Sequence, residues 1–387
     1  MWWRNTAAGL DRLVAATPDS RDRVVDAARA LSIVVVVMWH WTLSVTHRTA
    51  DGSLVMPNPI HVVPGGWAAT WVLQVMPLFF VVGGYANLVA FERARAEGTS
   101  AARFVGGRLR RVLWPTAVWA AAWLIGEAIG KVTAAALPGQ HRWIWQWFPG
   151  YLTPLWFIGV YTVLIVLVPF TAALHARAGA AALIVLGGLI LAGTAVQRGA
   201  GLVWVAWITA ALVWVFCHQL GYAWRGWQLG RRPLIVRMAI AVAGLAALVA
   251  LMVAGLPRSM VATVGEAESN LFPTNATIAA LAVFQLGLLA LITPAAERLL
   301  RRPVWWKPVV AINAVAMTVF VWHMTAYLAV LWIYEQAGAT LPATPTGAWW
   351  AQRWLWLVAP LPVLALLVMV FARAEVAARR QSRAAET

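Results

Sequence analysis

The chain has few charged residues and a single cysteine, and both shortages limit what it can be. Of its 387 residues only 11% are charged, whereas 62% are hydrophobic. A water-soluble protein of this length needs many more charges on its surface, so that class is excluded. A disulfide-stabilised secreted domain is excluded because Cys217 is the only cysteine. The hydrophobicity also excludes a disordered chain, and we expect an integral membrane protein.

Acidic residues are scarcer than basic ones. There are 14 Asp and Glu against 30 Lys and Arg, which gives a formal net charge of +16. A basic excess can indicate nucleic-acid binding, but that function needs a basic face clustered on one folded domain. Here the cations are spread through short segments between hydrophobic stretches. The lipid bilayer, and no nucleic acid, is the partner that this pattern predicts.

Ten stretches are apolar over about 20 residues, the length of helix that crosses the hydrocarbon core of a bilayer. Runs such as Ile33–Val37 lack the alternation of a transmembrane β-strand. Because spanning segments must satisfy their own backbone, the expected fold class is all-α, a polytopic membrane protein. The predicted spans are about 27–46, 66–91, 112–136, 152–173, 179–196, 200–219, 236–256, 274–293, 309–334 and 353–372.

Lys and Arg are divided unequally between the two sides of these spans. Twenty-four of the thirty lie in the N-terminal segment, the loops after even-numbered spans and the C-terminal tail. Cytoplasmic loops are rich in Lys and Arg, so both termini are expected in the cytoplasm. The organisation is then a cytoplasmic segment over 1–26, a ten-helix domain over 27–372 and a cytoplasmic tail over 373–387. Membrane orientation alone accounts for most of the arginines.

Ionisable residues of the first predicted span are functional candidates, because burying them in lipid is costly. Arg29 and His40 lie eleven residues apart, about three helical turns, so they share one face with a rise of roughly 16 Å. Asp26 and Arg29 are three residues apart and can pair. A neutral imidazole suits proton transfer, which makes His40 a candidate general base. A structural histidine bonded to backbone explains His40 equally well.

Arg108 and Arg111 precede the third predicted span and lie three residues apart, so they are adjacent on a helix. Two adjacent guanidinium groups can clamp a phosphate bidentately. Basic clusters at the cytoplasmic start of a helix more often reflect membrane topology alone. Both interpretations stay open for this pair.

Small and polar residues in the second predicted span form another candidate site. Gly83 and Gly84 allow another helix or a ligand to approach the backbone closely, and helix packing is the commoner reason for such a pair. Asn87 can hydrogen-bond across helices. Later in the chain, Trp156 opens the fourth span and His323 lies within the ninth, where a structural histidine is the commoner case. All five are candidate substrate contacts.

The aromatic segment 141–147 lies in a predicted outer loop and carries three tryptophans. Such side chains could stack on the face of a sugar. Anchoring at the membrane interface, where Trp is enriched, explains them at least as well.

Taken together, these segments resemble acyltransferase family 3, the bacterial integral-membrane acyltransferases. The resemblance rests on an Arg and a His separated by ten residues in the first helix, a Phe-Phe-x-x-Ser-Gly type segment and an Arg-x-x-Arg pair before the third helix. A Leu-Trp-Phe in the fourth helix and a late aromatic-His fit more loosely. The matching residues are Arg29 and His40 preceded by Asp26, Phe79–Gly84, Arg108 with Arg111, Leu155–Phe157 and Trp322-His323.

The resemblance implies an O-acyltransferase of the bacterial cytoplasmic membrane that uses acyl-CoA, expected to be acetyl-CoA, and no metal. The acceptor would be a hydroxyl of an exported glycan, a glycolipid or a small metabolite. Arg108, Arg111 and Arg29 would bind the phosphates of coenzyme A. His40 would act as general base or as transient acyl carrier, with Asp26 orienting Arg29.

Two alternatives remain open. A ten-helix transporter or exporter of a lipid or metabolite is one, although transporters usually have intramembrane acids, and Glu127 is the only acid inside a predicted span. The other is a non-catalytic assembly factor, because Gly83 stands where relatives commonly carry Ser. Binding of coenzyme A that is lost on changing Arg108 and Arg111 would separate the enzyme from both.

Overall fold

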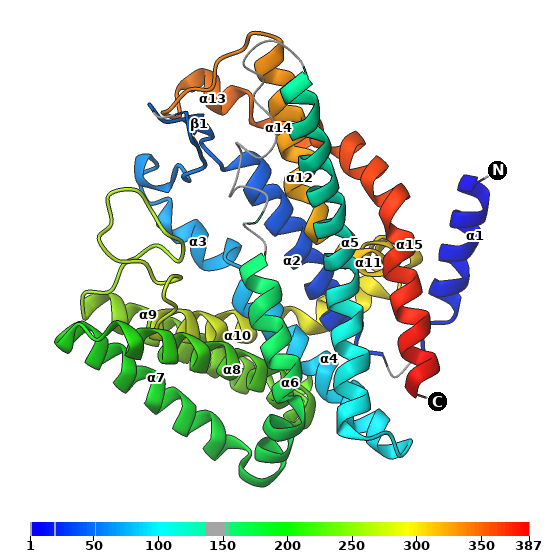
Figure 1. Ribbon diagram of the computed structural model, residues 1–387. Coiled ribbons are helices and arrows are strands. Elements are labelled where there is room, and N and C mark those ends of the chain that lie inside the picture. The colour runs from blue at the N-terminus through cyan, green and yellow to red at the C-terminus, as the bar shows by residue number, and fades with distance from the viewer. Residues whose placement is uncertain (1, 19–20, 51, 137–151, 153–154, 387) are drawn as a thin grey trace. The chain divides into compact units, whose positions relative to one another are not determined.

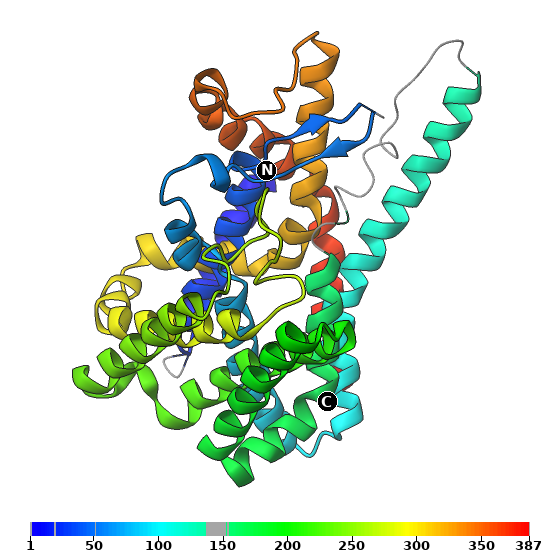
Figure 2. The same ribbon diagram turned by 90° about the vertical axis from the view of Figure 1, so that its left-hand side faces the viewer.

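The computed structural model describes residues 2–18, 21–50, 52–136, 152 and 155–386 (Figure 1). Most of these residues are helical. The named strands form one short hairpin, in which β1 (His47–Arg48) pairs with β2 (Leu54–Val55) (Figure 2). The all-α class expected from composition is confirmed. The aromatic segment 141–147, a predicted sugar contact, lies outside the described residues.

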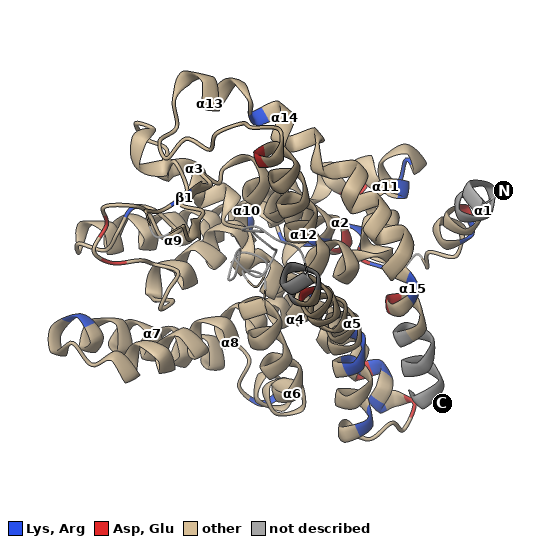
Figure 3. Cartoon of the chain, turned by 45° about the horizontal axis from the view of Figure 1, so that its top comes forward, with Lys and Arg blue, Asp and Glu red and all other residues tan. Residues whose placement is uncertain are grey.

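Ten helical segments of the described chain are long and apolar enough to span a membrane, and each overlaps one of the ten predicted stretches. Figure 3 shows Lys and Arg mostly near helix ends, with long helix middles free of charge. This is the pattern that a bilayer selects, because a charge at its centre is costly. The segments are Arg23–Thr42, Trp67–Ala96, Ala101–Gly130, Leu155–Ala178, Ala180–Ala200, Val203–Trp227, Leu234–Val253, Ala276–Leu300, Ala316–Gln336 and Gly347–Ala377.

The chain divides into two compact units, and the first comprises residues 1–32, 65–98 and 163–314. In this unit α10 packs along α9, and α8 packs against both α4 and α7. Its elements are α1 (Trp2–Ala15), the start of α2 (Arg23–Thr42), α3 (Trp67–Leu73), α4 (Met76–Ala96), most of α6 (Leu155–Ala178), α7 (Ala180–Ala200), α8 (Val203–Trp227), η4 (Leu229–Arg231), α9 (Leu234–Val253), α10 (Ala276–Leu300) and α11 (Pro303–Ala314).

The second unit comprises residues 33–64, 99–162 and 315–387. Its long helices form a group in which α15 packs against both α5 and α12 (Figure 1). Its elements are the remainder of α2, β1, β2, η1 (Ile60–Val62), α5 (Ala101–Ala136), the start of α6, α12 (Ala316–Gln336), α13 (Gly347–Ala351), α14 (Arg353–Val358) and α15 (Pro360–Glu386).

The second predicted span is not one continuous helix, because it breaks between α3 and α4 at Gln74 and Val75. A break leaves backbone carbonyls without helical partners, and these need donors inside a membrane. Gln285 of α10 supplies them: its amide Nε2 donates to the carbonyls of Trp71 at 3.1 Å and of Gln74 at 2.9 Å. The interruption is therefore stabilised by a residue far away in sequence.

The ninth predicted span is also interrupted, since α11 ends at Ala314 and α12 begins at Ala316. The free N–H groups at the start of α12 are satisfied by Glu375 of α15. The Glu375 carboxylate accepts from the backbone N–H of Thr318 at 2.9 Å and from its hydroxyl at 2.8 Å. Glu375 is 1% exposed.

Glu127 lies in the span Ala101–Gly130, and other acids belong to the described helices that are long and apolar enough to span a membrane. The described helices are longer than the predicted spans, and they include Glu335 in α12 and Glu375 in α15. The predicted tail 373–387 is a continuation of α15 as far as Glu386. A hydropathy profile does not predict that Glu375 is buried within a helix, because the groups that hydrogen-bond its carboxylate belong to another helix.

Candidate active site

A pair of histidines from two helices lies within the second unit. His40 Nδ1 is 2.9 Å from His323 Nε2, and the two ring planes differ by 16°. His40 comes from the last turn of α2, and His323 comes from α12. His323 is fully buried, whereas His40 is half-buried. The predicted general base and a predicted substrate contact are thus direct neighbours.

Hydrogen bonds assign the protons of the neutral pair. His323 Nδ1 is 2.6 Å from the carbonyl oxygen of Phe320, which can only accept, so this nitrogen is the donor. His323 Nε2 then accepts from His40 Nδ1–H. The lone pair of neutral His40 is left on Nε2, which has no partner among the described residues. His40 Nε2 is therefore free to accept a proton.

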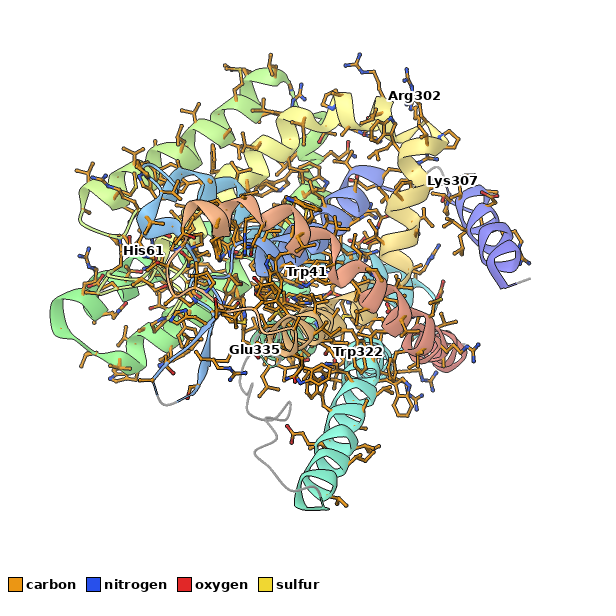
Figure 4. All side chains as sticks on the ribbon, turned by 90° about the horizontal axis from the view of Figure 1, so that it is seen from above. Trp41, His61, Arg302, Lys307, Trp322 and Glu335 are labelled. Carbon is orange, nitrogen blue, oxygen red and sulfur yellow. The ribbon has the colours of Figure 1, made fainter. Side chains whose placement is uncertain are left out.

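Hydrogen bonds to the backbone carbonyls of the two histidines fix their positions. Trp41, which is labelled in Figure 4 and is 1% exposed, donates its Nε1–H to the His323 carbonyl at 2.9 Å. The Ser44 hydroxyl donates to the His40 carbonyl at 2.7 Å. The residue next to His40 thus fixes the backbone of His323, so the α2 and α12 segments of this unit are tied together at the pair.

Aromatic rings from the start of α6 support the pair from one side. Phe157 packs edge-on against Phe320 with a centroid distance of 5.0 Å, and Phe320 lies 5.9 Å from the His323 ring. Trp156 packs edge-on against Phe157 at 6.4 Å and is 37% exposed. Trp156 is thus connected to His323 through two intervening rings, and its binding of substrate stays a prediction.

Helix α15 contacts α12 at two successive turns close to His323. Trp322 stacks on Phe371 with centroids 4.2 Å apart. One turn away on each helix, Glu375 binds the backbone and hydroxyl of Thr318. The two contacts fix the rotation and height of α12 at the position where it presents His323.

Asp26 and Arg29 lie in the first unit and form an ion pair of 3.5 Å, as their spacing predicts. Asn313, near the end of α11, bridges them: its Oδ1 accepts from Arg29 Nε at 2.7 Å and its Nδ2 donates to the Asp26 carbonyl at 2.9 Å. Asp26 also pairs with Arg21. Asp26 is therefore well placed to orient Arg29, and a catalytic role for either residue stays a prediction.

A polar cavity of about 670 Å³ opens in the first unit. Its wall combines the start of α2 with α4, the end of α8, η4 and the end of α10. Five arginines outnumber two acids, so the wall is basic, and the loops that form it are on the predicted cytoplasmic side. The lining residues are Arg21, Asp22, Arg23, Tyr85, Trp224, Arg225, Gln228, Gly230, Arg231, Thr293, Glu297 and Arg301.

The arginines of this cavity differ in their partners. Arg225 pairs with Glu92 at 3.1 Å. The guanidinium groups of Arg231 and Arg301 are exposed and make no hydrogen bond or ion pair with any residue that the structure describes. Unpaired guanidinium groups on a cavity wall are suited to binding phosphate. From the sequence, both residues were interpreted as signals of membrane orientation. Their role as candidate phosphate ligands is visible only because the fold brings them to the same cavity wall.

Arg108 and Arg111 lie one turn apart on α5 in the second unit, and both are half-buried. The helix confirms the adjacency that their spacing predicts. Phosphate binding by Arg108, Arg111 and Arg29 stays a prediction.

Gly84 of α4 marks a close crossing with α8. A Cβ atom added to Gly84 would come within 2.0 Å of the His218 carbonyl oxygen. Asn87, fully buried one turn later, bonds through Nδ2 to His218 Nε2 at 3.1 Å. Gly84 and Asn87 therefore serve helix packing here, and substrate binding by Gly83, Gly84 or Asn87 stays a prediction.

Each unit also has one contributing residue that carries no sequence signal. Phe320 assigns the histidine tautomers through its carbonyl, and Asn313 bridges Asp26 and Arg29. Neither residue stands out, because a carbonyl group is common to all residues and a single Asn is common at helix ends.

Comparison with known proteins identifies the family. The sequence matches the profile of the acyltransferase domain of acyltransferase family 3 over residues 22–374. No curated protein and no solved structure matches the chain. The matched range contains both histidines of the pair, Asp26 with Arg29, and Arg108 with Arg111. The chain therefore belongs to acyltransferase family 3.

Proposed function

We propose that this protein moves an acyl group, expected to be acetyl, from cytoplasmic acyl-CoA to a hydroxyl of an exported glycan, a glycolipid or a small metabolite. Family membership supports acyl transfer, and the observation that carries the mechanism is the hydrogen-bonded His40–His323 pair. We place the protein in the bacterial cytoplasmic membrane with both termini inside.

His40 acts as the general base. Its Nε2 takes the proton of the acceptor hydroxyl while the hydroxyl oxygen forms a bond to the thioester carbonyl carbon. The carbon–sulfur bond breaks, and the coenzyme A thiolate leaves and recovers the proton from the imidazolium. The products are the ester and free coenzyme A, with no co-reactant required.

His323 stabilises the charge that His40 gains. When His40 Nε2 is protonated, its Nδ1–H still points at His323 Nε2, and the Phe320 carbonyl accepts from the far nitrogen of His323. Positive charge is then shared over two rings and one carbonyl dipole. This resembles the way in which an orienting group supports the histidine of a catalytic triad.

The basic cavity of the first unit supports a donor site on the cytoplasmic side. Coenzyme A carries a diphosphate and a further phosphate. Arg231 and Arg301 offer, on the cavity wall, guanidinium groups that are unpaired among the described residues. Arg21 lines the same cavity and pairs with Asp26, which connects the cavity to the Asp26–Arg29 cluster. Arg108 and Arg111 remain a second candidate for phosphate binding.

The test is transfer of labelled acetyl from acetyl-CoA in membranes that contain the full chain or its His40→Ala variant. Mass spectrometry of lipids and glycans from a strain lacking the protein identifies the product by a lost acyl mass. We expect label in that product with the wild-type protein and about 10³-fold slower transfer with His40→Ala. Acetyl transfer by His40→Ala at the wild-type rate would contradict the mechanism in which His40 is the general base. Export of the same molecule without any acylation would establish the transporter instead.

A further inference from the structure

A small recess of about 10 Å³ lies in the second unit, where it is lined by α12, α13, α14 and the segment that follows α2. Figure 1 shows α13 and α14 at the same end of this unit as β1. The volume is close to what one water-sized particle occupies, so the recess has room for a single atom or a water molecule. Its lining includes the polar residues Ser44, Thr46, Tyr327, Tyr334, Gln352 and Arg353.

The Arg353 guanidinium is fixed beside this recess by two aromatic residues. Its Nε donates to the Trp349 carbonyl at 2.8 Å, and its Cζ lies 3.7 Å from the centre of the Trp349 ring. The centre of the Trp356 ring is 5.8 Å from the same atom. The four terminal N–H groups of Arg353 have no hydrogen-bond or ion-pair partner in the part of the chain that the structure describes.

The acid next to this recess in sequence is already neutralised. Glu335 follows Tyr334, and its two carboxylate oxygens accept from Arg48 at 2.8 and 2.9 Å. Among the described residues, neither Asp nor Glu lines the recess. A partly buried charge without a counterion is costly, so the Arg353 guanidinium is suited to an anion that the chain itself does not supply.

Further hydrogen-bond donors line the same recess. Trp356 is 4% exposed, and its indole Nε1–H is buried without a partner among the described residues. An indole N–H can only donate, so its partner must be an acceptor. The Tyr327 and Thr46 hydroxyls lie 2.6 Å apart, and whichever of them donates, the other keeps its proton for a further bond. The lining thus combines a cation with neutral N–H and O–H donors.

Size and charge together select the ligand. A water molecule fits the recess but leaves the guanidinium charge uncompensated. Sulfate, phosphate and carboxylate groups carry negative charge but contain several heavy atoms, for which the recess has no room. Chloride is a single atom that is only slightly larger than water, and it accepts hydrogen bonds from N–H and O–H groups on all sides.

We propose that this recess binds one chloride ion, with Arg353 as the cation and the Trp356 Nε1–H and the Thr46–Tyr327 hydroxyl pair as neutral donors. The ion joins α14 to α12 and to the segment that follows α2. These elements also carry the histidine pair, because Tyr327 follows His323 by one turn of α12 and Ser44 of the lining donates to the His40 carbonyl. Bound chloride therefore stabilises this end of the unit, and the assignment is independent of the proposed acyl transfer.

The test is line broadening in chlorine NMR spectra of the full chain in phosphatidylcholine nanodiscs, with sodium chloride added to a sodium gluconate buffer. Exchange of chloride with a protein site broadens its signal, and empty nanodiscs give the background. Trp356→Phe removes the indole N–H but keeps an aromatic ring, and Arg353→Gln removes the cation. The matched controls are Trp354→Phe, since Trp354 is 68% exposed on the same short helix, and Arg373→Gln at an exposed position of α15.

We expect the wild-type protein to give saturable broadening that bromide displaces. Trp356→Phe should weaken chloride binding about tenfold, the effect of losing a hydrogen bond to a charged group, and Arg353→Gln should abolish it. Both controls should bind chloride like the wild-type protein. Trp356→Phe is the milder change, and it keeps the test valid if Arg353→Gln does not fold.

Thermal unfolding gives a second readout. Chloride should raise the unfolding midpoint of the wild-type protein above its value in gluconate at equal ionic strength, because it binds only the folded state. Broadening that is absent from the wild-type protein, or that Trp356→Phe leaves unchanged, would overturn the chloride site, and so would identical midpoints in the two salts. Displacement of chloride by sulfate as readily as by bromide would overturn it as well, because a tetrahedral anion does not fit a recess for a single atom.

Discussion

His40 Nδ1 donates to His323 Nε2 across 2.9 Å. Among the described residues, the one ring nitrogen of the two histidines whose lone pair has no partner is therefore His40 Nε2. The direction of this bond follows from the Phe320 carbonyl, which cannot donate. A histidine that is half-buried thus presents a basic nitrogen, while its fully buried neighbour presents none. This asymmetry gives the two residues different roles.

Replacing His323 should therefore damage the reaction without removing the base. In His323→Ala the His40 Nδ1–H loses its acceptor, and the proton can sit on either nitrogen of His40. We expect kcat for acetyl transfer to fall roughly 10²-fold with the KM for acetyl-CoA unchanged, against about 10³-fold for His40→Ala. Steady-state kinetics in nanodiscs measures both values.

The pH profile separates this role from a merely structural one. Activity of the wild-type protein should rise with pH as the pair loses its proton, because only neutral His40 accepts one. His323→Ala should move the midpoint of that rise, whereas Trp354→Ala should leave it in place. A His323→Ala enzyme with wild-type kcat and midpoint would contradict the shared-charge mechanism.

Arg231 and Arg301 of the basic cavity, whose guanidinium groups have no partner in the described part of the chain, give a second prediction. Arg231→Gln and Arg301→Gln should each raise the Kd of acetyl-CoA about tenfold or more, since a hydrogen bond to a charged group contributes about 1.5–3 kcal/mol. The effect should weaken with added salt. Isothermal titration with acetyl-CoA measures it.

Arg298→Gln is the control for these variants, because Arg298 is exposed, lies on α10 and does not line the cavity. It should bind acetyl-CoA normally. The alternative is that Arg108→Gln and Arg111→Gln abolish acetyl-CoA binding while Arg231→Gln and Arg301→Gln leave its Kd unchanged. That result would show that the phosphates of the donor bind at α5.

The spans and the first helix were predictable because each depends on a local property. About 20 apolar residues are required wherever a helix crosses lipid, and the Arg29–His40 spacing is read within one helix. The break at Gln74 was not predictable, since the donor that stabilises it is Gln285, more than two hundred residues away. Pattern reasoning has no access to such a partner.

The site follows the same division. His40 and His323 each stood out as ionisable residues in apolar surroundings, but their hydrogen bond depends on how α2 and α12 pack. Arg231 and Arg301 looked like orientation signals, because a loop arginine has the same sequence context whether or not it lines a cavity. Contacts between distant segments decide these cases.

Glu375 gives a prediction about stability. Its buried carboxylate accepts from the Thr318 N–H and hydroxyl, so Glu375→Ala leaves these donors unsatisfied at the start of α12. We expect a loss of about 2–4 kcal/mol, and a smaller loss for Glu375→Gln, whose amide oxygen still accepts. Thermal unfolding in detergent measures the order. Arg373→Gln, an exposed change on the same helix, should unfold like wild type.

Gly84 gives the sharpest packing prediction, because the space for a side chain is already occupied. A Cβ there would lie 2.0 Å from the His218 carbonyl oxygen, so Gly84→Ala must push α4 and α8 apart. We expect a loss of about 1–3 kcal/mol or more from this overpacking. Gly188 in α7 is the matched control, since nothing lies within 4 Å of its added Cβ. Gly188→Ala should be neutral or stabilise by about 0.5–1 kcal/mol, as alanine does in a helix. Equal thermal unfolding of the two variants would show that α4 and α8 do not cross as closely as Gly84 requires.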